Sequence, residues 1–136
     1  MNNDEQFIGE IRMFSGDFAP KGWAFCNGAQ FDTKKNTFLF SLLGYHFGDV
    51  SQRIARLPDL RSRVPINYGE IKRSEYYEVG TSMGTEKASA SKSMPGHYKA
   101  GAPTQFKAAE VNHSIIQPVL AVNFIIALEG VYPPRP

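Results

Sequence analysis

The stretch FIGEIRMFSGDFAPKGWAFCNG, residues 7–28, sets the fold of this chain. Its first eight residues alternate, with Ile11 and Met13 on one face and Glu10 and Arg12 on the other. Successive side chains of a strand point to opposite sides, so this period of two is typical of a half-buried strand. We therefore predict a strand over 7–14.

The second half of the same stretch predicts two changes of direction. Residues 15–22, SGDFAPKG, are rich in turn formers and should reverse the chain. The run WAFC then leads into Asn27-Gly28, a pair that favours the type I′ turn of a two-residue hairpin. We expect residues 29–31 to return as the second arm, so that the chain begins as a small antiparallel sheet.

One short helix is expected after this sheet. Leu39, Leu42 and Leu43 are spaced i, i+3 and i+4, which places them on one helical face. Asp32 or Thr33 can cap the first turn. The helix should end near Leu43.

The remaining segments differ in character. Residues 57–67 hold two prolines, which favour a stiff extended or edge segment. Residues 68–114 carry few apolar side chains and predict an irregular tip or insertion. The apolar run at 115–128 predicts a strand buried on both faces, against its own core or a neighbouring subunit. We expect a β-rich α+β domain in three parts, 1–67, 68–114 and 115–136, and an intertwined homotrimer.

The composition excludes several classes of protein. The 136 residues carry 15 Lys and Arg against 13 Asp and Glu, a net charge of only +2, which disfavours a nucleic-acid partner. One cysteine excludes a disulfide scaffold. The apolar run at 119–128 is too short to span a bilayer, so membrane insertion is not expected. The polar start MNNDEQ does not look like a signal peptide.

Four blocks in the chain together resemble a known family. They are FIGEIRMFSGDFAPKGWAFCNG at 7–28, FSLLGYHFGD at 40–49, LPDLRSRVPI at 57–66 and QPVLAVNFIIALEGVYP at 117–133. In this order they resemble the phage tail collar domain, a family that includes microcystin-dependent proteins. The resemblance implies a trimeric module of a virion tail or fibre tip, extracellular or surface-associated, with a fibre or tail protein as partner.

The resemblance also raises a metal question. Related fibre proteins carry a Met-Pro loop with two histidines that meet on a threefold axis and bind a metal. The matching stretch here, 93–98, supplies His97 but ends in Tyr98 rather than in a second histidine. Three copies of His97 would still suit zinc. The alternative, a solvated loop histidine, is favoured, and no cofactor is expected.

Arg61 and Arg63 lie two residues apart and would share one face of an extended segment. Their guanidinium groups suit carboxylates or phosphates on a surface glycan. The competing interpretation, which we favour, is an ion pair with a neighbouring chain that fixes the register of the trimer.

Aromatic and basic residues of the polar region are the other candidate ligand contacts. Tyrosine combines a large contact face with a hydroxyl at low entropic cost, and lysine attracts anionic polymers. The candidates are Tyr76, Tyr77, Tyr98, Lys92 and Lys99.

Catalysis is not expected. No serine lies in a G-x-S-x-G pattern, and no glycine-rich phosphate loop is present. Cys26 follows apolar residues and is interpreted as a packing residue. The function that we expect is an adhesin-like attachment module for host cells, a receptor-binding trimer that takes a cell-surface carbohydrate. The alternative is a structural trimerisation or folding cap of a fibre with no ligand of its own.

Overall fold

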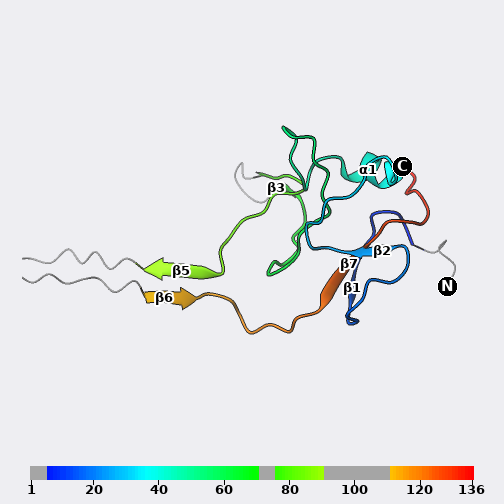
Figure 1. Cartoon of the computed structure of the whole chain (residues 1–136). Helices are drawn as coiled ribbons and strands as arrows, with labels where there is room; N and C mark the ends of the chain where they lie inside the picture. Colours follow the sequence, from blue (N-terminus) through cyan, green and yellow to red (C-terminus); the bar gives the residue numbers. More distant parts are fainter. Residues whose placement is uncertain (1–5, 71–75, 91–110) are drawn as a thin grey trace, which may run out of the picture. The chain divides into compact units, whose positions relative to one another are not determined.

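The computed structural model describes residues 6–70, 76–90 and 111–136 (Figure 1). The chain divides into two compact units, Met1–Ser82 with Ala121–Pro136, and Met83–Leu120. Its elements are short strands and one short helix, so the predicted β-rich α+β class is confirmed. Within the described residues, no helix is long and apolar enough to cross a membrane.

The first unit is organised by a three-stranded antiparallel sheet. It contains β1 (Ile11–Phe14), β2 (Trp23–Phe25) and β7 (Asn123–Ala127), in the order β1-β7-β2. The strand from the far end of the chain therefore lies between two strands from its beginning. Figure 1 shows the three strands close together. Ile126 faces Ile11 on one side and Ala24 on the other.

The two predicted strands that end up in this sheet are both shorter than expected. Gly9 has a φ of +82°, and the Glu10 N–H donates to the Phe7 carbonyl, so a turn precedes β1. The apolar face of β1 is also not covered, because Met13 is 71% exposed. At the other end only β7 is a strand. Leu120 is 88% exposed, so burial of the whole run 115–128 was wrong for the single chain.

The predicted hairpin at Asn27-Gly28 was wrong. A type I′ turn needs a positive φ at both residues, but only Gly28 has one, at +74°. The Asn27 side chain instead accepts a hydrogen bond from the Ala29 N–H, 3.1 Å away. The chain runs on, and residues 26–31 pair with 55–60 through hydrogen bonds such as Leu57 N–H to the Ala29 carbonyl.

Helix α1 spans Thr37–Leu43, four or five residues later than the predicted cap. Asp32 is used in a turn before the helix, where its carboxylate accepts from the Lys34 and Lys35 N–H groups. The predicted apolar face is confirmed, since Leu39 is fully buried and Leu42 and Leu43 pack against the core.

The core of the first unit is small. Its buried cluster joins one residue from each of five segments: Ile8, Cys26, Leu39, Leu57 and Ile126. The unit also holds a short ribbon, in which β3 (Gly69–Glu70) pairs with β4 (Tyr76–Tyr77).

The second unit is a two-stranded antiparallel ribbon. Its strands are β5 (Lys87–Ala90) and β6 (Val111–Ser114), with Lys87 opposite Ser114. The pairing ends with a hydrogen bond from the Ile115 N–H to the Glu86 carbonyl. Figure 1 shows the two arrows running in opposite directions.

Candidate attachment surface

Arg61 is held by a carboxylate of its own chain. Its Nε donates to Asp59 Oδ1 at 2.8 Å and its Nη2 to Asp59 Oδ2 at 2.7 Å, a two-point pairing. The Arg61 N–H also donates to Asp59 Oδ1. The hydrogen bonds from Arg61 hold the pKa of Asp59 below its usual range, and the charge of Arg63 adds to this effect.

The expected geometry of the arginine pair was wrong. Arg61 and Arg63 do not lie on one extended segment, because the Arg63 N–H donates to the Leu60 carbonyl and Ser62 has a φ of +54°. The chain makes a tight turn here, and Asp59 opens it by accepting a hydrogen bond from the Arg61 N–H. Because Arg61 already pairs with Asp59, it is less available for an anion from outside.

A shallow hollow of about 270 Å³ lies beside this turn. Two asparagines, Asn27 and Asn123, contribute polar groups to its lining, and Arg61 lies at its edge. Asn123 also donates from Nδ2 to the Gly16 carbonyl at 2.7 Å, which fixes its amide. No sequence pattern predicts this grouping, because it depends on β7 pairing between two early strands. The full lining is Phe25, Cys26, Asn27, Leu60, Arg61, Val122, Asn123 and Phe124.

Tyr76 and Tyr77 lie on strand β4, opposite Glu70 and Gly69 respectively. Tyr76 is 60% exposed, whereas Tyr77 is half-buried. The segment after them is positioned by Gly80, whose φ is +89° and where a Cβ would overlap the His46 carbonyl. Tyr76 therefore presents an exposed ring, whereas much of Tyr77 is covered. Together they offer less contact surface than two exposed tyrosines would.

Trp23 is half-buried on β2, and the guanidinium group of Arg12 lies over its ring. The Arg12 guanidinium carbon lies 5.2 Å from the ring centroid, while its Nε donates to Glu10 Oε1 at 2.6 Å. The hydrogen bond from Arg12 lowers the pKa of Glu10, as does the Phe7 N–H. With one ring face covered by Arg12, Trp23 is a structural residue of the sheet.

Four predicted site residues lie outside the described ranges: His97, Tyr98, Lys92 and Lys99. In the part of the chain that the structure describes, no group of three or more His, Cys, Asp or Glu is placed to hold a metal ion. The metal hypothesis rests on His97, so it stays a prediction.

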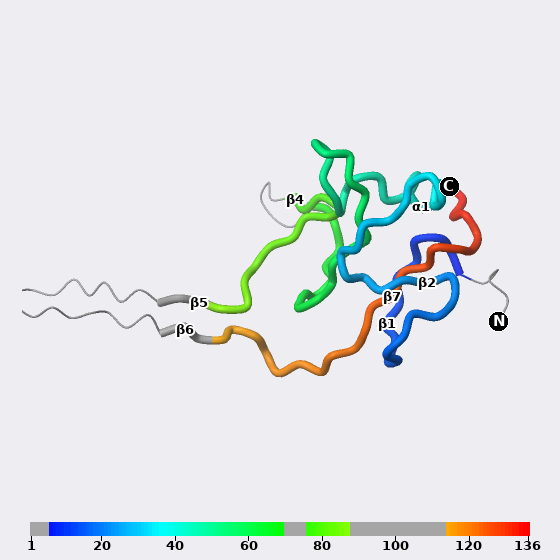
Figure 2. Tube along the Cα trace, in the orientation of Figure 1, coloured from blue at the N-terminus to red at the C-terminus, as the bar shows by residue number. Residues whose placement is uncertain are grey.

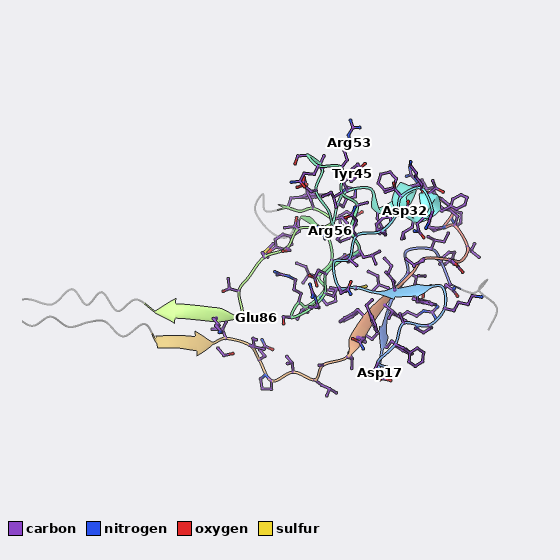
Figure 3. All side chains as sticks on the ribbon, viewed as in Figure 1. Asp17, Asp32, Tyr45, Arg53, Arg56 and Glu86 are labelled. Atoms are coloured by element: carbon purple, nitrogen blue, oxygen red, sulfur yellow. The ribbon has the colours of Figure 1, made fainter. Side chains whose placement is uncertain are left out.

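Figure 3 labels several other charged residues, which do not belong to the Arg61 turn. In Figure 3, Arg53 and Arg56 belong to the loop after α1, and Asp17 to the turn after β1. Asp49 organises that loop: its Oδ1 accepts from the Ser51 hydroxyl at 2.6 Å and from two backbone N–H groups. These hydrogen bonds lower the pKa of Asp49. Its role is to close a turn.

Strands β1 and β2, the pairing of 26–31 with 55–60 and the Asp59 turn all fall within one family match, whereas β7 lies outside it. Residues 9–65 match the phage tail collar domain. The match indicates a structural module of the phage tail fibre class, a virion tail component that would associate with tail-fibre proteins. Among curated proteins, none matches the chain.

Proposed function

We propose that this chain is a non-enzymatic attachment module of a phage tail fibre that binds a cell-surface glycan as a homotrimer. The observation that carries the proposal is the match of residues 9–65 to the phage tail collar domain. Such a module works at the surface of the virion tail, where contact with a cell is its natural task.

The distribution of apolar side chains supports the assembly into a trimer. Large hydrophobic residues such as Met13, Val64 and Leu120 are more than two-thirds exposed, while few are buried. Large exposed apolar patches mark sites of protein interaction in soluble proteins. A homotrimer would cover part of this surface.

The ligand side of the proposal rests on the open tyrosine of β4. Tyr76 offers a ring face and a hydroxyl, the combination used where one side chain must contact both apolar and polar parts of a ligand. Tyr77 and Tyr98 are its expected partners. Lys92 and Lys99 would draw anionic polymers toward them.

The experiment compares the intact chain with a variant that carries Tyr76→Ala, Tyr77→Ala and Tyr98→Ala. Binding to whole cells and to purified envelope polysaccharides is measured, and native mass spectrometry reports the oligomer. We expect the variant to stay trimeric and to lose most of its binding. Val50→Ser, at an exposed site in the loop after α1, is the control and should bind normally.

The second candidate function is a trimerisation or folding cap without a ligand. The exposed apolar surface favours it as much as it favours an attachment module. A trimer that binds no cell or polymer at any density would establish the cap and reject attachment. A stable monomer at micromolar concentration would reject both.

A further inference from the structure

A second hollow, of about 390 Å³, lies where the C-terminal tail passes helix α1. Thr37, Phe38 and Ser41 line it from the helix, and Tyr132 lines it from the tail. Figure 2 shows the red end of the tube beside α1. We call these four residues the α1 hollow. Its volume lies in the lower part of the range for small-molecule sites.

Two aromatic rings form the floor of the α1 hollow. The ring centroids of Phe38 and Tyr132 are 6.0 Å apart with an angle of 60° between the planes, an edge contact. Phe38 is 64% exposed and Tyr132 40% exposed, so each ring keeps an open surface. A phenylalanine held in water in this way forgoes the free energy of burial.

The direction of the hydrogen bonds made by the Ser41 and Tyr132 hydroxyls follows from their partners. The Ser41 hydroxyl donates its single hydrogen to the Phe38 carbonyl at 2.7 Å. Ser41 Oγ and Tyr132 Oη are 3.0 Å apart, so Tyr132 must be the donor of that hydrogen bond. Both oxygens are left with lone pairs and no free hydrogen. The oxygens of Ser41 and Tyr132 therefore favour a ligand that donates hydrogen bonds.

We infer that the α1 hollow binds a neutral sugar residue of the surface glycan, an inference that rests on the proposed function. A pyranose presents a C–H face to an aromatic ring, and its hydroxyls can donate to Ser41 Oγ and Tyr132 Oη. No charged side chain lines the α1 hollow, which disfavours an anionic sugar. The Thr37 side chain makes no hydrogen bond within the described residues, so its hydroxyl is available to the ligand as well.

The hydrogen-bond acceptors of the α1 hollow also argue against a proline-rich peptide as the ligand. Proline segments suit aromatic grooves, but proline has no N–H to donate, so it could not use the remaining lone pairs of Ser41 Oγ and Tyr132 Oη. The apolar side of a second copy could not use them either. A sugar can both stack on the rings and donate hydrogen bonds to the oxygens.

The test uses the intact chain on an array of immobilised neutral and anionic glycans, with glucose, galactose, mannose and N-acetylglucosamine as competitors. Phe38→Ala should weaken binding to neutral glycans by about tenfold or more, the effect of losing an aromatic contact. Tyr132→Phe keeps the ring and removes one acceptor, and should weaken binding by about threefold. Phe18→Ala is the matched control, because Phe18 is 62% exposed and outside the α1 hollow.

Three results would overturn the inference. The first is binding to cells or anionic polymers but to no neutral sugar, which leaves the proposed function intact. The second is neutral-sugar binding that Phe38→Ala does not weaken more than Phe18→Ala. The third is loss of the oligomer in Phe38→Ala alone, which would assign the α1 hollow to a contact between copies. Failure of the proposed function differs from these, because no glycan and no cell would then be bound.

Discussion

At the scale of the residue, Cys26 shows how burial changes the chemistry of a side chain. Its thiol is 4% exposed in the core cluster, and burial raises its pKa to about 11. The folded protein therefore keeps it as a neutral thiol at physiological pH. It packs as a small apolar group, in agreement with its place after three apolar residues.

Cys26 in the folded chain should be alkylated by iodoacetamide much more slowly than in urea, because the thiolate is the nucleophile and the site is closed. The contribution of the buried Cys26 thiol to stability should be fully present below the pKa of the unfolded thiol, about 8.5. It should be lost as the pH rises toward the folded pKa of about 11, because the thiol ionises first in the unfolded chain. Mass spectrometry of the labelled chain measures the rate. Equal rates with and without urea would show that Cys26 is not buried.

The carboxylates of Asp59 and Glu10 should contribute stability that is lost in acid, whereas the contribution of Cys26 is lost in alkali. Their pKa values are lowered in the folded chain by hydrogen bonds from Arg61 and Arg12, so their contribution is present above the unfolded pKa. It is lost as the pH falls through the folded pKa. Both pairs are near the surface, where water screens the charges, so each contributes little to stability.

Asp59→Asn should therefore cost little stability at pH 7 and make urea unfolding less sensitive to pH between about 5 and 2. Asp17→Asn, in the exposed turn after β1, is the control. An Asp59→Asn chain with an unchanged acid profile would show that the Arg61 pairing does not stabilise the fold.

At the scale of the element, β7 determines the sheet. Ile126 is fully buried, while Ile11, its register partner on β1, is 42% exposed. The same residue type thus occupies opposite environments on adjacent strands, which gives a matched comparison.

Ile126→Ala should lower the free energy of unfolding by about 2–5 kcal/mol, because it removes apolar contact and leaves a cavity. Ile11→Ala should cost less than about 1 kcal/mol in the single chain. Urea denaturation at low protein concentration measures both. A larger loss for Ile11→Ala that grows with concentration would instead place β1 in a subunit interface.

Local sequence signals predict the elements of this chain better than the pairings between its distant segments. The spacing of Leu39, Leu42 and Leu43 predicts the helix because the signal is local. The hairpin after Cys26 fails because Asn27-Gly28 is a local turn signal that long-range pairing with 55–60 overrides. The α1 hollow could not be foreseen, since Ser41 and Tyr132 are 91 positions apart.

At the scale of the whole molecule, the buried core lies entirely in the first unit. All buried apolar residues of the described chain fall before Ser82 or after Ala121. The second unit adds a ribbon and apolar side chains such as Val119, which is 76% exposed. The buried core that stabilises the described chain thus lies in the first unit.

Replacement of residues 83–120 by a Gly/Ser linker of about ten residues should leave the first unit folded, because no core side chain is removed. Circular dichroism and urea unfolding should resemble those of the full chain. If the second unit carries subunit contacts, native mass spectrometry should show a smaller oligomer. An unfolded product would contradict the independence of the first unit.

The position of β7 has a consequence for biosynthesis. β1 and β2 do not pair with each other; each is hydrogen-bonded only to β7, within the sheet that the structure describes. A nascent chain that has not yet reached Asn123 therefore lacks the strand that joins its first two. The sheet can form only after residues 123–127 have been synthesised, and the early apolar segments remain uncovered until then. Such late closure of long-range contacts slows folding and gives neighbouring copies time to associate.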